Sequence, residues 1–374
     1  METEITNMSS TQEPMTQPHG AAPRRGPLRA GDRVQLTDEK RRMNTITLTL
    51  GGTFHTHKGL LAHDDLIGQT EGVVVENTSG HRYQVLRPLL KDFVLSMPRG
   101  AAVVYPKDAA QIVTMGDIYP GARVVEAGVG SGALSISLLR AVGDAGTLHS
   151  IERREEFAEI ARGNVETIFG GPHPAWDISI GDYQDVVVQT EEPGSVDRVV
   201  LDMLAPWECV EATATVLAPG GVWINYVATV TQLSRTAEAI RADGRFTEPE
   251  AWESMVRGWH LEGLAVRPDH RMVAHTGFLM TCRRLADDAV GIPGQKRVKN
   301  TEFATEDIEA WTKGNDPEQW NGPGLGERGV SVRKLRRAAK DAKSMKQRGS
   351  FRDENGNGMD PDDFPEIESA DDEN

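Results

Sequence analysis

The segment Glu126-Ala-Gly128-Val-Gly130-Ser131-Gly132-Ala133-Leu134 is the strongest local motif of this chain. It follows the short apolar run RVVEA and opens the helical pattern SGALSISLLRAVG. Glycine permits a tight turn and lets the backbone approach a ligand closely. The free N–H groups at a helix start can bind an anionic group or a carboxylate. A plain turn that needs positive φ is the alternative interpretation of such a loop when it is considered alone.

The residues around this loop alternate between strand-like and helix-like segments from about residue 101 to residue 286. The apolar runs TLHSIER, WDISIGD, VDRVVLDM and VWINYVAT are each separated from the next by a stretch of helical pattern. Alternation with short connections implies right-handed crossovers and a parallel, doubly wound sheet. The runs MVRGWHLEGLAVRP and HTGFLMTCRRL predict two more strands, and one antiparallel strand at a sheet edge is expected. This part of the chain is therefore expected to be an α/β domain.

Residues 28–100 have a different sequence pattern. Short β-like runs, separated by Gly, Asn and Pro, predict a small β barrel or sandwich. The runs are ITLTLGG, GLLAHDDLIG, EGVVVEN, HRYQVLRP and KDFVLSMP. The sequence thus predicts a small N-terminal β domain joined to the α/β domain.

Both ends of the 374-residue chain are polar, and we expect both to be disordered. Residues 1–27 are a leader rich in Ser, Thr, Pro and Gly. Residues 287–374 form a tail in which 333–352 carry +8 and 353–374 carry −10 of the net −15. The basic stretch has the pattern of a helix that forms when bound. It could contact RNA, or it could pair with the acidic segment.

Composition excludes several classes of protein. Cys209 and Cys282 are too few and too far apart for a disulfide framework or a zinc cluster, which fits a reducing cytoplasm. No signal peptide and no run of roughly 18 apolar residues is visible. His55, His57 and His63 lack a carboxylate or cysteine at ligand spacing, so no metal is expected.

Two acids stand at successive strand ends beyond the glycine loop. Open α/β sheets bind ligands at the carboxyl ends of their strands. Glu152 could accept hydrogen bonds from ribose hydroxyls, although an NAD enzyme places an acid similarly. Asp182 could accept one from the adenine amino group. Dinucleotide enzymes use G-x-G-x-x-G, whereas this loop has G-x-G-x-G, a form characteristic of class I methyltransferases that bind S-adenosylmethionine.

The fourth strand ends in Leu201-Asp-Met-Leu-Ala-Pro-Trp-Glu208, where class I methyltransferases present the acceptor atom. With Tyr105-Pro-Lys-Asp108, this segment resembles the tRNA adenine-58 N1-methyltransferases, in their actinobacterial and other bacterial form. Supporting motifs are the glycine loop, Glu152, Gly181-Asp182, Tyr226 to Ser234, Gly258-Trp259, Arg267-Pro268 and His275-Thr276. The resemblance runs from about Leu28 to Leu285 and leaves out both tails.

This resemblance implies a Rossmann-like class I methyltransferase domain, with a mostly parallel sheet and an antiparallel edge, beside the small β domain. It implies transfer of a methyl group from S-adenosyl-L-methionine to N1 of adenine 58 in the T-loop of tRNA, without a metal, by a homotetramer. Asp202 and Tyr105 would be the catalytic residues. The cofactor-binding residues would be Gly128, Gly130, Ser131, Gly132, Ala133, Leu134, Glu152, Phe157, Asp182 and Asp202.

Other functions stay open at this point. A methyltransferase for another RNA position, a protein or a small molecule would share the fold. A non-catalytic tRNA-binding subunit should lack the glycine loop or the acid of the fourth strand, and both are present. The glycine spacing and the Asp202-to-Trp207 loop argue against an NAD-linked oxidoreductase. Candidates for tRNA contact in the small domain are Lys40, Arg41, Arg42, Lys58, Arg82 and Arg87, each of which is otherwise an ordinary surface charge.

Overall fold

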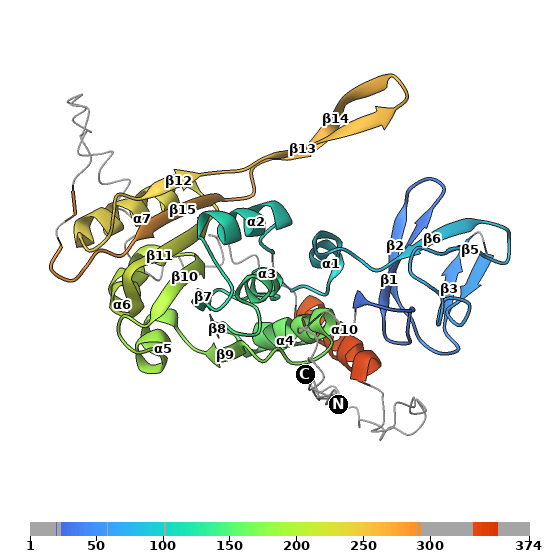
Figure 1. The fold of residues 1–374 in the computed structure, drawn as a ribbon, viewed down its shortest axis with the longest axis horizontal. Coiled ribbons are helices and arrows are strands. Elements are labelled where there is room, and N and C mark those ends of the chain that lie inside the picture. Colours follow the sequence, from blue (N-terminus) through green and yellow to red (C-terminus); the bar gives the residue numbers. More distant parts are fainter. Residues whose placement is uncertain are drawn as a thin grey trace, which may run out of the picture.

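A seven-stranded sheet forms the centre of the larger domain (Figure 1). The computed structural model describes residues 20, 24–57, 59–100, 102–289, 291–292 and 332–350. The strand order is β12-β15-β11-β10-β7-β8-β9. The strands are β7 (Arg123–Ala127), β8 (Thr147–Glu152), β9 (Trp176–Ile180), β10 (Val196–Asp202), β11 (Leu217–Val227), β12 (Glu250–Trp252) and β15 (Phe278–Arg283).

The five strands from β11 to β9 run parallel, whereas β15 pairs antiparallel with both β11 and β12. The predicted doubly wound sheet with an antiparallel edge is therefore confirmed. Parallel pairing also brings the carboxyl ends of β7, β8 and β10 to one edge of the sheet. The glycine loop and the predicted acids follow those ends.

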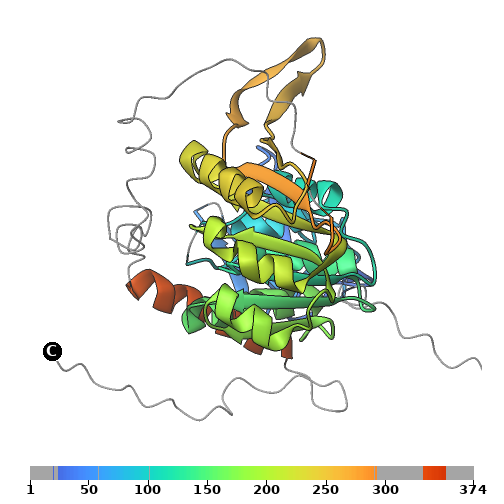
Figure 2. The same ribbon diagram turned by 90° about the vertical axis from the view of Figure 1, so that its left-hand side faces the viewer.

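Helices cover both faces of this sheet (Figures 1 and 2). One face packs against α2 (Pro106–Met115), α3 (Ala133–Val142) and α4 (Glu155–Phe169). The other packs against α5 (Tyr183–Thr190), α6 (Val210–Val216) and α7 (Val230–Asp243). Burial on both sides explains why the strand sequences are continuous apolar runs rather than alternating patterns.

The small domain contains a four-stranded antiparallel sheet in the order β2-β1-β6-β5 and a separate hairpin, β3–β4. The strands are β1 (Arg33–Asp38), β2 (Met43–Thr47), β3 (Thr53–Thr56), β4 (Gly59–Ala62), β5 (Val74–Glu76) and β6 (Arg82–Leu86). Leu28, Val34, Leu36, Leu48 and Val85 are buried in its own core.

The run KDFVLSMP is a helix, α1 (Leu90–Ser96), so its prediction as β-like was wrong. Phe93, Val94 and Met97 are buried together against the core of the larger domain. Residues three and four apart lie on one face of a helix, whereas residues three apart point to opposite sides of a strand. Packing against the larger domain thus decides the conformation of a segment whose composition alone is ambiguous.

The run MVRGWHLEGLAVRP does not add a strand to the central sheet. It forms most of a two-stranded hairpin, β13 (Val256–Glu262) and β14 (Ala265–Val273), which projects away from the sheet (Figures 1 and 2). The apolar side chains of Trp259, Leu261 and Leu264 are exposed on it. Their hydrophobicity made the run resemble a strand of the central sheet.

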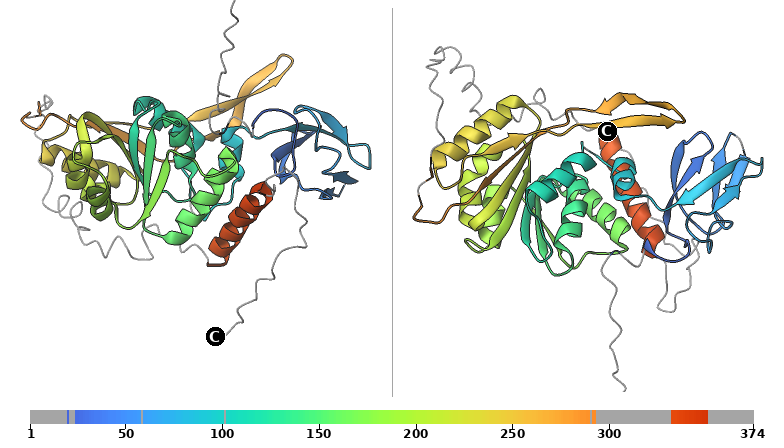
Figure 3. Two further views of the ribbon diagram at one scale, coloured as in Figure 1. Left: turned by 60° about the horizontal axis from the view of Figure 1, so that its bottom comes forward. Right: turned by 45° about the horizontal axis from the view of Figure 1, so that its top comes forward.

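Residues Val332–Ser350 of the tail form a helix, α10, which packs along α4 (Figure 3). We expected the whole of 287–374 to be disordered and the basic stretch to become helical on binding. In the structure the surface that orders this stretch is α4 of the same chain. The leader up to residue 19 and the acidic segment 353–374 lie outside the described residues.

Candidate functional site

The glycine loop lies against the end of β10. Gly128, Gly130 and Gly132 have φ values of +86°, +54° and +79°, which side chains rarely adopt. A Cβ on Gly128 would lie 1.8 Å from the carbonyl oxygen of Asp202. Only glycine at position 128 lets these two backbones approach, so this residue fixes the predicted catalytic acid relative to the loop.

Two glutamates stabilise the glycine loop and the strand before it. Glu126 is fully buried, and its Oε2 accepts hydrogen bonds from Ser135 Oγ at 2.7 Å and Ser150 Oγ at 2.8 Å. Burial raises the pKa of Glu126 to about 7. Glu152 Oε2 accepts a hydrogen bond from the Gly130 N–H at 3.0 Å. The carboxylate predicted to bind ribose therefore lies directly at the loop.

Asp202 shares this acidic environment. Burial, together with the nearby carboxylates of Glu126 and Glu152, raises its pKa to about 7. A carboxyl group that is fully ionised only above neutral pH is a stronger hydrogen-bond acceptor and base than an ordinary aspartate. A cation placed among these three acids would be stabilised by all of them.

The other predicted residues lie around this centre with different degrees of exposure. Asp182 follows β9, and its side chain is 43% exposed and paired with Arg153 at 2.7 Å. Ala133 and Leu134 are buried in the first turn of α3, where helices leave N–H groups without intrahelical partners. Phe157 is buried in the first turn of α4, under the Arg154 guanidinium at 3.9 Å. Its side chain packs in the interior, and a role in cofactor binding stays a prediction.

Tyr105 and a second tyrosine, Tyr226, face the same region as Asp202. The Tyr226 hydroxyl donates a hydrogen bond to the Thr276 carbonyl at 2.8 Å, and burial raises its pKa above the ordinary value. Asp202, Tyr105 and Asp108 are near enough to raise that pKa further. Sequence reasoning quoted Tyr226 only as the start of a motif and did not place it at the site.

The Tyr-Pro-Lys-Asp motif is anchored by a buried ion pair. Lys107 Nζ lies 2.6 Å from Asp108 Oδ1, and Thr276 Oγ1 donates to Asp108 Oδ2 at 2.6 Å. Tyr105 precedes α2 at its N-cap. This cluster ties the start of α2 to the segment before β15 and so brings the Tyr-Pro-Lys-Asp motif and the His275-Thr276 motif together despite their separation in sequence.

Two amide side chains, which the sequence analysis did not predict, fix backbone segments that border the site. Gln232 Nε2 donates to the Leu204 carbonyl at 2.9 Å and thereby fixes the loop after β10 to α7. Asn164 Nδ2 donates to the carbonyls of Pro98 and Ser131, both at 2.9 Å. Both amides are buried on helix faces, and a polar residue on an otherwise apolar face was the only available signal.

The residues fit S-adenosylmethionine, which has a cationic sulfonium and no phosphate. Three glycines with positive φ form a cradle, and the buried Oε1 of Glu126 has no hydrogen-bond partner among the described residues. Acids at the ends of β8, β9 and β10 suit a cationic ligand with ribose hydroxyls and an adenine amino group. The fold and this site define a Rossmann-like, S-adenosylmethionine-dependent methyltransferase of class I.

Comparison with known proteins identifies the family. Residues 83–266 match the family described as "tRNA methyltransferase complex GCD14 subunit", and residues 26–75 match "TrmI-like N-terminal". The tRNA (adenine(58)-N(1))-methyltransferase TrmI of Thermus thermophilus is 34% identical over 67% of this chain and 95% of its own length. The chain therefore belongs to the family of tRNA (adenine-58-N1)-methyltransferases.

Solved structures agree with this assignment. The tRNA (m1A58) methyltransferase TrmI of Aquifex aeolicus superposes with a TM-score of 0.62 at 26% identity, over 70% of this chain and all of that chain. A Thermotoga maritima protein described as an SAM-dependent O-methyltransferase has a TM-score of 0.65 at 30% identity, over 70% and 96% of the two chains.

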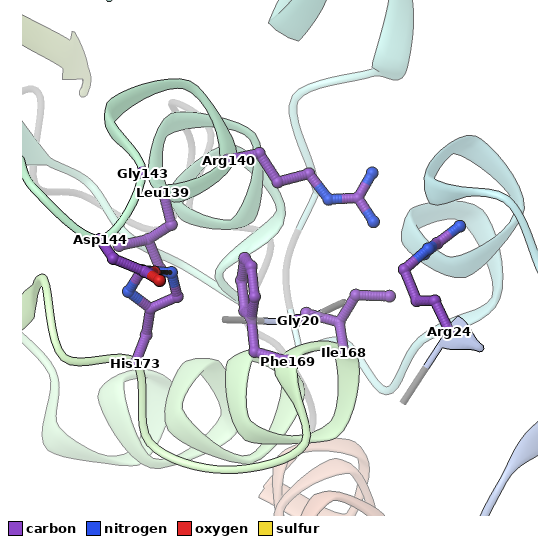
Figure 4. Close-up of a pocket in the computed structure, with 9 residues that line it drawn as sticks. All are labelled: Gly20, Arg24, Leu139, Arg140, Gly143, Asp144, Ile168, Phe169 and His173. Atoms are coloured by element: carbon purple, nitrogen blue, oxygen red, sulfur yellow. Dashed lines mark ion pairs between the residues drawn. The ribbon is translucent and has the colours of Figure 1, made fainter. Parts of the chain in front are cut away.

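A cavity of about 330 Å³ lies away from this site (Figure 4). Arg24, Arg140, Phe169 and His173 line it at the C-terminal ends of α3 and α4, whereas the glycine loop is at the N-terminal end of α3. It is therefore not the cofactor site. Across the described ranges, no group of three or more potential metal ligands occurs, and no helix is long and apolar enough to cross a membrane.

Proposed function

We propose that this protein transfers the methyl group of S-adenosylmethionine to N1 of adenine 58 in tRNA. The observation that carries the proposal is the acid Asp202, held by Gly128 at the rim of an intact glycine loop. Membership of the family agrees, because its relatives from Thermus thermophilus and Aquifex aeolicus are named for this reaction. The family also includes subunits of complexes, but a chain with this loop and this acid has the parts for catalysis.

The cofactor would lie across the carboxyl ends of β7, β8 and β9. The loop from Gly128 to Gly132 and the first turn of α3 would bind its methionine part, Glu152 its ribose, and Asp182 its adenine. When bound, it supplies an electrophilic methyl group. Opening of the Arg153–Asp182 ion pair would free the Asp182 carboxylate for the adenine amino group.

Asp202 would act on the adenine rather than on the methyl donor. N1 of neutral adenine already has an in-plane lone pair, so catalysis needs alignment more than a strong base. The Asp202 carboxylate would accept a hydrogen bond from the N6 amino group and stabilise the positive charge that develops on the ring. Its raised pKa also suits it to take the N6 proton afterwards. Tyr105 and Tyr226 would orient the base.

The adenine has to leave its stacked position in folded tRNA, at a cost of a few kcal/mol. Phosphate contacts would offset this cost and make binding sensitive to salt. Lys40, Arg41 and Arg82 are exposed and suit this role. Arg87 does not, because its side chain is 8% exposed and paired with Asp32 and Glu71. Lys58 lies outside the described residues.

We also propose a homotetramer in a reducing cytoplasm. The projecting β13–β14 hairpin exposes Trp259, Leu261, Leu264 and Val266, and exposed apolar clusters commonly mark interfaces. Cys209 and Cys282 are free and buried. Light scattering should give about four times the chain mass of 40.9 kDa, and Leu261→Lys with Leu264→Lys should lower it. A monomer for the unaltered chain would contradict the tetramer.

The decisive test uses labelled methyl donor and an unmodified tRNA transcript. After digestion, we expect the label in 1-methyladenosine, and we expect it to disappear when adenine 58 is replaced. Label on another base would leave the class of enzyme intact and contradict the target. Label in a methyl ether, formed on a hydroxyl oxygen, would favour the O-methylation for which the Thermotoga maritima relative is described.

A further inference from the structure

The described cations of helix α10 lie on one side of the helix, and its other side packs against the protein. Leu335, Ala338 and Ala342 face the body of the protein, and Ala342 is 1% exposed. Arg333, Arg336, Lys340 and Lys343 are exposed. Their spacings of three, four and three residues place them in one stripe, opposite the packed face. The docked helix thus presents a fixed row of positive charge to solvent.

The packing against α4 depends on small residues. A Cβ on Gly163 of α4 would lie 2.8 Å from Cβ of Ala342, so the absence of that Cβ lets the two helices approach. Leu335 fills a second contact, because a Cβ on Gly100 would lie 2.6 Å from its Cδ2. The geometry of α10 is therefore set by complementary surfaces rather than by charge.

The same contacts place α10 next to the cofactor loop. Phe157, in the first turn of α4, contacts the same position, because its ring lies 3.1 Å from that Cβ. The Gly100 N–H donates to Ser131 Oγ of the glycine loop at 3.3 Å. Gly100 thus links the first turn of α10 to the glycine loop.

We propose that the exposed stripe of α10 (Arg333, Arg336, Lys340 and Lys343) binds phosphates of the substrate tRNA. This inference rests on the proposed function. The stripe spans about 15 Å, long enough to contact several phosphates. Within the described part of the chain, none of these four side chains forms an ion pair; the neighbouring Arg337 lies 3.9 Å from Asp341. In a chain of net charge −15, such a local positive surface is suited to a polyanion. Both family matches end before α10, so the contact is an addition to the shared enzyme.

The test neutralises the stripe and measures tRNA affinity as a function of salt. In the full chain, Arg333→Gln, Arg336→Gln and Lys340→Gln together should weaken tRNA binding about tenfold or more near physiological salt. The slope of log affinity against log salt should become shallower by about two to three. Turnover at saturating tRNA and cofactor affinity should both stay within about twofold of the unaltered chain, since the stripe contacts neither the reacting base nor the cofactor.

A matched control removes the same charge elsewhere. Arg123→Gln, Arg241→Gln and Arg283→Gln lie on β7, α7 and β15, and we expect them to leave the salt slope unchanged. If both triple variants bind tRNA like the unaltered chain, the stripe does not contact tRNA and the inference is wrong. If the unaltered chain methylates tRNA while the α10 variant is unaffected, only this inference fails. If the unaltered chain neither binds nor methylates tRNA, the proposed function fails with it.

The alternative to tRNA as the binding partner of the stripe is the acidic segment 353–374. A chain shortened after Arg352 separates the two cases. If the stripe binds tRNA, neutralising it in the shortened chain should weaken tRNA binding at least as much as in the full chain. If the stripe pairs only with the acidic segment, neutralisation should have no effect in either chain, and that result would overturn the inference.

Discussion

The backbone of Gly128 touches that of Asp202, because a Cβ at position 128 would lie 1.8 Å from the Asp202 carbonyl oxygen. The residue that shapes the glycine loop thereby also sets the position of the acid that we propose to face the acceptor. The geometries of the loop and of this acid are therefore coupled through one backbone contact at the ends of β7 and β10. Loss of that contact should affect both partners of the reaction.

Gly128→Ala should weaken cofactor binding by about tenfold or more and reduce turnover further, because the loop or β10 must shift. Positive φ alone costs an alanine about 1–2 kcal/mol. Gly143→Ala is the matched control, since Gly143 has a φ of +65° and nothing within 4 Å of its added Cβ. The two variants are compared by calorimetry of cofactor binding and by thermal unfolding. Equal behaviour of the two variants would show that backbone strain, rather than the contact, matters.

The pH dependence of kcat/KM should reflect Asp202. Its pKa is raised to about 7, and the ionised form is the one that accepts the N6 hydrogen bond. Activity should therefore rise with pH and level off above about 7. The bound sulfonium favours the charged carboxylate, so the corresponding rise in kcat should occur at lower pH. A flat profile of kcat/KM between about pH 5.5 and 8.5 would exclude this carboxyl group as the titrating one.

Gln232→Glu should loosen the loop after β10 without disrupting α7. Glutamate can still accept the Thr229 N–H in the capping box but cannot donate to the Leu204 carbonyl. We expect kcat/KM for tRNA to fall several-fold, with the cofactor dissociation constant unchanged. Gln232→Ala removes both contacts and should in addition lower the unfolding temperature. A tRNA kcat/KM equal to that of the unaltered enzyme in Gln232→Glu would mean that the Leu204 contact is dispensable.

Gly163→Gln should displace α10 from α4. The new side chain would occupy the place of Ala342, while glutamine at a helical position is intrinsically more favourable than glycine by up to about 1 kcal/mol. The central fold should survive, and trypsin should cut within 333–348 much faster than in the unaltered chain. Gly170→Ala is a control at the end of α4. An unchanged cleavage rate in Gly163→Gln would show that the packing of α10 on α4 does not depend on Gly163.

The sequence predicted the parts of the site that have a fixed spacing along the chain. Glu152 ends a strand, the glycines and Asp182 come just after strands, and in a parallel sheet the ends of strands meet at one edge. Asn164 and Gln232 were not predictable, because each acts through the backbone carbonyl of a distant segment. No pattern in the sequence specifies such a partner.

The docking of α10 escaped prediction for a different reason. Its packed face consists largely of alanines, which give almost no apolar signal among so many charges. The residue of α4 against which α10 packs is a glycine, Gly163, and an absent side chain cannot be recognised from a hydrophobic pattern. Similarly, α1 was predicted as a strand because its burial depends on the larger domain rather than on its own neighbours.

The most direct test of the account compares Asp202→Asn with the unaltered enzyme in two measurements on the same preparations. Single-turnover transfer of labelled methyl to a tRNA transcript reports on the chemical step, and calorimetry reports on cofactor binding. We predict that methyl transfer to adenine 58 slows by about 100-fold or more, while the cofactor dissociation constant changes only a few-fold. A near-normal transfer rate, or a loss explained entirely by weaker cofactor binding, would contradict the role of Asp202 at the acceptor base.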